Sequence, residues 1–432
     1  HQIYEKRGMG FVMKKETLIR KLRHNRTRML TTAKWIGVSV ITGCVVGLIA
    51  SIFALLLNLV TELRILHPQL LLLLPVGAVV IVALYRGLLK EKDPGTDLVL
   101  SAIHSGDKIP LRMAPLIFLS TLITHLCGGS AGREGAALQL GGSIGNAIGK
   151  WFHFTSKDRH IIIMCGMSAA FSALFGTPIA AAVFSLEVVS VGIMHYAALL
   201  PSVISSLIAR AIALAFSLEA PAYEILNLPA FSPLPAAKTA LLALLCGLIS
   251  MFFCILLHQT RDLGQKFLPN PYLRALVGGS LVLLFTFLAG SQNYNGIGTD
   301  VIAGCMEGNV APEAFLLKMV FTAVTLAAGY KGGEIVPTLF VGASFGCLVG
   351  GWLDLSPSLG AAVGMGALFC GVTNAPITSL LLCLELFGMD AAPFLLLSVA
   401  VSYTVSGYYG LYNSQRIVYS KYKSDFINKK TE

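Results

Sequence analysis

Long apolar segments recur along this chain from Trp35 to Tyr408, and they constrain its fold more than any other feature. A run of about 18 or more apolar residues is long enough to cross the hydrocarbon core of a bilayer as a helix. Only 12% of the residues are charged, whereas a soluble globular protein has about 25%. The sequence therefore predicts an all-α polytopic membrane protein.

Basic residues gather at the two ends of the chain and account for much of its net charge of +10. Ten Lys and Arg residues precede Trp35 and five follow Tyr412. The positive-inside rule therefore places both termini in the cytoplasm, with the multi-pass protein in a cell membrane that we expect to be a bacterial inner or plasma membrane. Nucleic-acid binding is not favoured, because these basic ends directly flank membrane segments and lack interleaved aromatic residues.

Nine cysteines are scattered along the chain, most of them inside apolar segments. They form no CxxC pair and no cluster with histidine, which is the pattern that zinc and redox sites require. The sequence thus predicts buried thiols and no metal or other cofactor.

Two glycine-rich loops place charge inside the apolar sequence. Residues 128–136 read GGSAGREGA, and residues 332–337 read GGEIVP. A charged residue at membrane depth is costly and indicates a functional site. Each loop leads into an apolar helix, and helix N-termini offer unpaired N–H groups and partial positive charge to an anion. We expect the two loops to face each other at the middle of the membrane with an anion between them.

Three segments of the first half recur in the second half, in the same order. They are residues 95–99, 134–145 and 177–187, which match the segments beginning at residues 298, 335 and 375 at offsets of 203, 201 and 198. Short, interrupted apolar segments in matching positions of two halves indicate an internal repeat with a binding site built from broken helices. If each half has an odd number of spans, the two copies have opposite orientations in the membrane. The predicted parts are a basic cytoplasmic segment (1–34), a first membrane repeat (35–218), a proline-rich linker (219–237), a second membrane repeat (238–412) and a cytoplasmic tail (413–432).

The N-terminal segment has two open interpretations. Its leucines recur at roughly helical spacing, which is compatible with an amphipathic helix on the inner membrane surface. A solvated basic tail accounts for the same residues.

Glu134 is the main candidate for chemistry. Its carboxylate is itself an anion at an anion site, so it can occupy the site when charged and leave it when protonated. Each exchange of the carboxylate for an anion would then be coupled to the transfer of a proton. The alternative is a structural Glu134 paired with Arg133, although adjacent residues on a helix do not face each other.

Glu334 lies in the second loop and has several possible roles. It could carry a proton, accept a hydrogen bond from Glu134 or from a protonated anion, or cap its own helix. The predicted anion-binding residues of the loops and the apolar vestibule are Gly95, Gly132, Arg133, Gly135, Glu334, Ile335 and Val336.

Three further polar residues have two interpretations each. Glu187 and Glu385 end equivalent apolar segments, where we expect structural residues at the membrane boundary rather than a proton path. Tyr412 follows the last apolar span, so its phenol could bind the ion or lie in an interfacial aromatic belt.

The motifs resemble those of the CLC family of anion channels and transporters. Residues 132–136, GREGA, are similar to the family's GREGP loop, and residues 332–337 are similar to its GGxFxP loop. Both copies of Pro-Ile…Leu-Glu and the late Tyr412 fall in the family's order. The resemblance implies a CLC-like inverted-topology repeat with broken and re-entrant helices, and a homodimer with one pore per subunit. It also implies Glu134 as the gating glutamate and Tyr412 as the tyrosine of the central anion site.

Three departures are similar to the fluoride-exporting branch of that family. Pro94 aligns with the serine of the family's first anion loop, Val188 replaces the glutamate of its proton relay, and Glu334 replaces an apolar residue. The resemblance therefore implies a fluoride/proton antiporter that exports fluoride from the cytoplasm. The sequence after Tyr412 is too short for the paired nucleotide-binding domains of many eukaryotic members, so we expect none.

Two other functions remain open. A chloride/proton antiporter or passive chloride channel could use the same fold. A membrane enzyme acting on a lipid is disfavoured, because the apolar spans lack the clustered Asp and His of a metal site. The predicted partners are fluoride or chloride, protons, membrane lipid and a second copy of the chain, and no nucleic acid.

Overall fold

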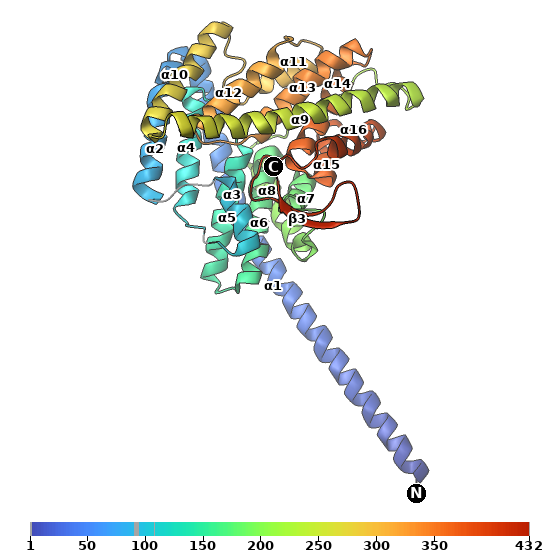
Figure 1. Cartoon of the computed structure of the whole chain (residues 1–432). Helices are drawn as coiled ribbons and strands as arrows, with labels where there is room; N and C mark the ends of the chain where they lie inside the picture. The colour runs from blue at the N-terminus through green and yellow to red at the C-terminus, as the bar shows by residue number, and fades with distance from the viewer. Residues whose placement is uncertain (1, 90–94, 108, 432) are drawn as a thin grey trace.

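The computed structural model describes residues 2–89, 95–107 and 109–431 of the chain, and helices account for most of them (Figure 1). The first half contains α1 (Gln2–Leu66), a short 3-10 helix (Pro68–Leu73), α2 (Leu74–Leu89), α3 (Thr96–Ser105), α4 (Met113–Cys127), α5 (Glu134–Trp151), α6 (Ser156–Phe175), α7 (Pro178–Glu187), a second 3-10 helix (Tyr196–Ala198) and α8 (Leu199–Ala215). The second half contains α9 (Pro233–Phe267), α10 (Pro271–Ala289), α11 (Thr299–Met306), α12 (Ala314–Ala328), α13 (Ile335–Trp352), α14 (Pro357–Thr373), α15 (Pro376–Phe387) and α16 (Ala392–Val405).

A small sheet joins the tail to the first half. Its strands are β1 (Ser190–Val191), β2 (Arg416–Tyr419) and β3 (Phe426–Lys430), in that order, with β1 parallel to β2 and β2 antiparallel to β3. The sequence did not predict these strands. They attach the segment after Tyr412 to the end of α7, which helps to fix that tyrosine.

The helices repeat in the order that the sequence predicts. The equivalent helices α4 and α12 both have 15 residues, and α5 and α13 both have 18. Two predicted boundaries fall differently from the helix ends, since α1 runs through residue 34 without a break and α9 begins at Pro233, inside the segment predicted as linker. The predicted all-α membrane fold with a repeat is confirmed.

The two halves cap each other's helices through Glu187 and Glu385. The carboxylate of Glu385 accepts hydrogen bonds from two backbone amides at the start of α7, at 3.0 and 2.8 Å. Glu187 accepts from the two equivalent amides of α15, also at 3.0 and 2.8 Å. A carboxylate at a helix N-terminus satisfies orphan N–H groups and the positive end of the dipole. These contacts support the structural interpretation of both glutamates, and their reciprocity relates the halves by a pseudo-twofold axis.

Glycines allow the helices that follow the two loops to pack at very short range. A Cβ atom on Gly141 of α5 would lie 2.1 Å from the carbonyl oxygen of Gly166 on α6. The equivalent contact in the second half joins Gly342 of α13 to Gly364 of α14, at 2.5 Å. Such backbone contact, which only small residues permit, is a means of helix association in membranes. It holds α5 and α13 rigidly at the centre of each half.

The relative direction of α1 and α8 shows that the N-terminal segment and the segment after α8 lie at opposite ends of the molecule. Gly43 of α1 contacts Ser205 of α8, and Gly47 contacts Ala209, so the two helices run parallel. The segment after α8 therefore lies at the opposite end from the N-terminal part of α1, which projects away from the other helices (Figure 1).

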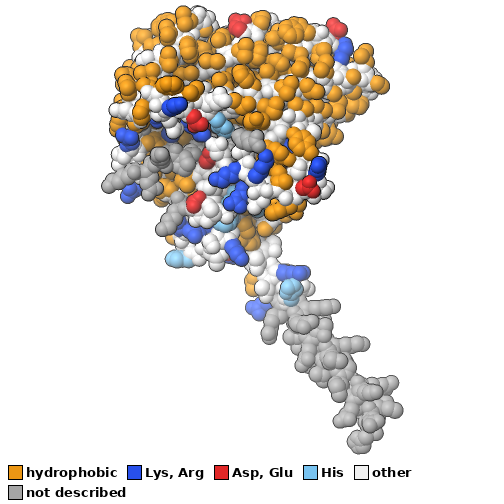
Figure 2. Space-filling model, in the orientation of Figure 1, with side chains coloured by type: hydrophobic (Ala, Val, Ile, Leu, Met, Phe, Trp, Pro, Cys, Tyr) orange, Lys and Arg blue, Asp and Glu red, His pale blue; other side chains and the backbone are white. Residues whose placement is uncertain are grey.

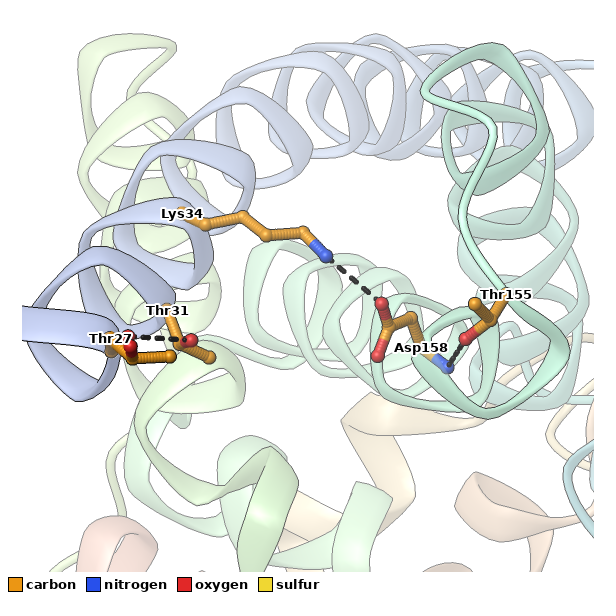
Figure 3. A network of polar contacts seen from close by, with 5 residues as sticks. All are labelled: Thr27, Thr31, Lys34, Thr155 and Asp158. Carbon is orange, nitrogen blue, oxygen red and sulfur yellow. Dashed lines mark hydrogen bonds and ion pairs between the residues drawn. The ribbon is translucent and has the colours of Figure 1, made fainter. Parts of the chain in front are cut away.

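An ion pair marks the place where α1 enters the helical body. Lys34 Nζ lies 2.9 Å from Asp158 Oδ2 near the start of α6, and the backbone N–H of Asp158 donates to Thr155 Oγ1 (Figure 3). An exposed pair of this kind contributes about 0–1 kcal/mol. Its main effect is on geometry, because it holds the first membrane span against the start of α6.

Six helices of the described residues are long and apolar enough to cross a membrane. Hydrophobic side chains cover the face formed by α9 and its neighbours, whereas Lys and Arg concentrate nearer to α1 (Figure 2). Contiguous exposed apolar surface on this scale is typical of contact with lipid. The chain is a multi-pass membrane protein.

The close contact at Gly141 gives a test of the packing. Gly141→Ala should lower the free energy of unfolding by about 1–3 kcal/mol, because the added Cβ overpacks a backbone contact. Gly37→Ala in α1 is the matched control, since nothing lies within 4 Å of its added Cβ. Thermal unfolding of the purified protein in detergent would measure both, and equal midpoints for the two variants would contradict the packing.

Candidate functional site

The two glycine-rich loops are joined by a reciprocal pair of backbone hydrogen bonds. Gly132 N–H donates to the carbonyl of Gly333 at 2.6 Å, and Gly333 N–H donates to the carbonyl of Gly132 at 2.8 Å. The two glycines are equivalent in the repeat, since they are 201 residues apart, the offset of the surrounding segment. The loops therefore meet at the pseudo-twofold axis, and α5 and α13 begin on either side of it.

Glycine is required at this meeting point. A Cβ on Gly333 would lie 2.4 Å from the backbone nitrogen of Gly135, and a Cβ on Gly135 would lie 3.0 Å from Gly333 Cα. The absence of side chains lets two helix N-termini approach each other, and their partial positive charges add at one place.

The carboxylate of Glu134 lies between these two N-termini. It is 1% exposed, and its Oε2 accepts a hydrogen bond from the backbone N–H of Arg133 at 3.0 Å. The carboxylate also interacts with the backbone amides of Glu134 itself and of Val336, the second residue of α13. It thus occupies the position in which N–H groups of both loops would hold a small anion.

Arg133 contacts this carboxylate more directly than expected. Its Nε lies 3.7 Å from Glu134 Oε1, so the expectation that the two side chains do not face each other is wrong. The reason is that Arg133 is the N-cap of α5 and lies outside the helix. Its other nitrogens bind Leu174 O at 3.1 Å and Asn58 Oδ1 at 3.4 Å, which anchors the guanidinium beside the loop.

A largely apolar cavity connects Glu134 to the side of the molecule that carries the segment between the repeats. Its lining includes Arg133, Glu134 and Val336 at the loops and Tyr223 in that segment. Of the two predicted vestibule residues, Val336 lines the cavity, whereas Ile335 is fully buried beside it. Among the residues that line this cavity, Glu134 is the acidic one.

Tyr412 lies on the other side of the paired loops. It is 2% exposed, and its hydroxyl has no hydrogen-bond partner among the described residues. Glu334, Asp97 and Glu134 all lie within electrostatic range of it. A buried hydroxyl that donates to no protein group is available to donate to an ion, which is the role that the sequence suggested for this residue.

Asp97 holds the backbone next to Tyr412, a role that the sequence did not indicate. Its Oδ1 accepts two hydrogen bonds from Ser414, one from the backbone N–H at 2.9 Å and one from the hydroxyl at 2.8 Å. The equivalent residue of the other repeat, Asp300, is exposed. The repeat therefore identified the motif in both halves, but it did not indicate that Asp97 alone binds the backbone next to Tyr412.

The loop that leads into α3 also contacts α5. Gly95 is the N-cap of α3 with a φ of 67°, and the hydroxyl of Thr96 lies 3.4 Å from the carbonyl of Gly135. Gln139 Nε2 donates to that hydroxyl at 3.1 Å, while Gln139 Oε1 is buried and has no partner among the described residues. Gln139 is a second polar residue of the site that sequence reasoning missed. Pro94, aligned with the family's serine, lies outside the described residues.

Glu334 is turned away from Glu134. It is the N-cap of α13 but makes no side-chain capping hydrogen bond, so capping of its own helix, one of the roles that the sequence left open, is not supported. Asp97, Arg261 of α9 and Lys331 lie within electrostatic range of it. The two glutamates come from paired loops, and Glu134 faces the cavity side while Glu334 faces the Tyr412 side.

Comparison with known proteins decides the family. A family model described as a voltage gated chloride channel matches residues 77–407. The chain belongs to the CLC family. A chloride/fluoride channel protein of Pseudomonas syringae is 33% identical over 397 residues, which cover 90% of this chain and 88% of that one.

Solved structures agree with this assignment. A CLC-type fluoride/proton antiporter superposes with a TM-score of 0.86 at 30% identity, covering 89% of this chain and 98% of that one. A slow cyanobacterial Cl−/H+ antiporter gives 0.69 at 21% identity, covering 86% and 94%, and shows the fold alone. The predicted resemblance to the CLC family is confirmed, including its similarity to proteins named for fluoride.

A chloride-transporting relative is more distant. The H(+)/Cl(-) exchange transporter ClcA of Vibrio cholerae is 28% identical over 296 residues, and the alignment covers 64% of this chain and 62% of that protein. This CLC chain has the fold of anion/proton antiporters.

The free hydroxyl of Tyr412 predicts that Tyr412→Phe keeps the stability of this CLC protein and loses anion affinity. One lost hydrogen bond of about 1.4 kcal/mol corresponds to a tenfold weaker affinity. Tyr330→Phe is the matched control, because the Tyr330 hydroxyl donates to the carbonyl of Leu74 and its loss should lower stability. Calorimetric titration with halide and thermal unfolding would measure both, and a large loss of stability in Tyr412→Phe would contradict a free hydroxyl.

The contact between Asp97 and Ser414 predicts a second effect on Tyr412. Asp97→Ala removes both hydrogen bonds that fix Ser414, so the tyrosine two residues earlier should be less well ordered and anion flux should fall several-fold. Asp300→Ala, at the equivalent exposed position, should leave flux unchanged. Anion efflux from liposomes would compare the two, and equal rates would show that Asp97 does not position Tyr412.

Proposed function

We propose that this CLC protein exports fluoride from the cytoplasm in exchange for protons. The observation that carries the proposal is the position of the Glu134 carboxylate between the N-termini of α5 and α13. A carboxylate and a fluoride ion have the same charge and compete for the same N–H groups. Transport without a covalent step accounts for the site, so we propose that the protein is not an enzyme.

The exchange follows from electrostatics. A charged Glu134 is attracted by the two helix N-termini and blocks the ion's position. A proton arriving through the cavity removes that charge, the neutral side chain leaves, and an anion takes its place. Each exchange of anion for carboxylate therefore moves one proton in the opposite direction to the anion.

The residues on the Tyr412 side fit an anion that is a strong hydrogen-bond acceptor. The free hydroxyl of Tyr412 offers a donor to fluoride, while the buried Oε1 of Gln139 offers an acceptor to hydrogen fluoride. Glu334 supplies an exchangeable proton near Tyr412. Val188, at the position of the relay glutamate, is apolar and fully buried, so Glu334 is the residue that we propose takes over proton transfer on this side.

The names of the similar proteins favour fluoride over chloride. The Pseudomonas protein is named for both ions and the structure at TM-score 0.86 for fluoride, whereas the chloride transporter of Vibrio aligns over a shorter segment. We further propose that the protein works as a homodimer in a bacterial membrane with both termini in the cytoplasm.

Glu134→Gln tests the mechanism. Glutamine keeps the shape of the side chain but carries no exchangeable carboxyl proton, so fluoride-driven proton movement should fall to the level of empty liposomes. Glu334→Gln should also lose proton movement while still passing fluoride. Glu307→Gln is the control, because Glu307 is exposed at the end of α11. Fluoride and pH electrodes would follow both ions at once.

Two outcomes would contradict the proposal. Proton movement that stays coupled to fluoride in Glu134→Gln would show that this residue is not the proton carrier. Chloride that moves with protons as fast as fluoride does in the unmodified protein would favour the chloride/proton antiporter.

A further inference from the structure

Three basic side chains from different helices are buried together behind the loop that carries Glu134. They are Arg64 near the end of α1, His125 in the last turn of α4 and Lys318 in α12, and they are 6%, 1% and 0% exposed. None of the three lines the cavity at Glu134.

Lys318 is bound to the loop between α10 and α11. Its Nζ donates to the carbonyls of Gly296 at 2.7 Å and Tyr294 at 3.2 Å. That loop is in turn bound to the start of the GREGA loop, since Gly296 N–H donates to Gly129 O at 3.1 Å. Lys318 therefore stabilises the backbone that leads to Glu134.

Arg64 and His125 have polar side-chain atoms without a well-formed hydrogen bond in the part of the chain described. Arg64 Nε and Nη1 and both ring nitrogens of His125 are buried without such a partner, although the ring of His125 lies near the backbone of Gly132. Arg64 and Lys318 both lie within electrostatic range of His125. Over the described residues no ion pair joins any of the three to a carboxylate.

This arrangement is costly unless an anion is bound. A guanidinium stays charged in any protein environment, and a buried charge without a partner is strongly destabilising, especially at membrane depth. Unpaired donors converging from two helices supply the contacts that an anion requires. We propose that Arg64, His125 and Lys318 form a second anion site, separate from the transport site, which holds one small halide per subunit.

The packing around Arg64 limits the size of this ion. A Cβ on Gly128 would lie 3.3 Å from Arg64 Cδ, and a Cβ on Gly296 would lie 3.1 Å from Arg64 Nη2. Backbone so close to the guanidinium excludes an ion as large as phosphate or sulfate, so the proposed occupant is a monatomic ion. Fluoride, the smallest halide and the strongest acceptor, is the probe of choice. The bound ion would hold residues 128–132 in place and would thereby stabilise the first turn of α5.

Counting bound ions tests the second site. Equilibrium dialysis of the purified full-length chain in detergent, read with a fluoride electrode, gives the number of fluoride ions bound per subunit. Arg64→Met should bind one ion fewer than the unmodified protein, and Lys318→Met should do the same from a different helix. Lys238→Met is the matched control for charge, because Lys238 is partly exposed and forms an ion pair with Asp354 at 3.4 Å.

Stability in fluoride gives an independent reading. If the site holds an anion, the thermal midpoint of Arg64→Met should rise less with fluoride concentration than that of the unmodified protein. Unchanged ion counts in both variants, together with an unchanged fluoride dependence of the midpoint, would overturn the proposal and leave water as the partner of these donors. These readings do not depend on transport, so loss of proton coupling in Glu134→Gln and loss of an ion in Arg64→Met test different sites.

Discussion

The rest of the structure depends on the pair of backbone hydrogen bonds between Gly132 and Gly333. These two bonds join equivalent loops of the two repeats, and they bring the N-termini of α5 and α13 to one place inside the helical body. Neither helix alone offers an anion more than one ring of N–H groups. Together they surround the Glu134 carboxylate, and the glycine contacts of α5 with α6 and of α13 with α14 keep both helices in position.

The backbones of the two repeats are related by symmetry, but several side chains at equivalent positions differ in their identity or contacts. Glu187 and Glu385 obey the pseudo-twofold axis and each caps a helix of the other half. Glu134 aligns with the apolar Ile335, and Asp97 binds Ser414 while Asp300 is exposed. Equivalent positions of the two repeats thus have different contacts, and Glu134 lies on one side of the paired loops while Tyr412 and Glu334 lie on the other.

Much of the site could be predicted from the sequence, because a charge inside an apolar segment is costly and is seldom kept without a function. Prediction succeeded for the pairing of the loops and for the repeat. It failed where a contact depends on the exact end of a helix. Arg133 contacts Glu134 because it lies one residue outside α5, and the side chain of Glu334 leaves its own helix uncapped and lies near Asp97 and Tyr412.

The sequence by itself determined the membrane class, the repeat and the family, since these depend on local hydrophobicity and on motifs that can be read in order. Only the tertiary structure decided which distant polar groups meet. Asp97 and Ser414 are 317 residues apart, and Arg64, His125 and Lys318 come from three helices. No local pattern marks such groups, because only the folded chain brings residues so far apart in the sequence within reach of one another.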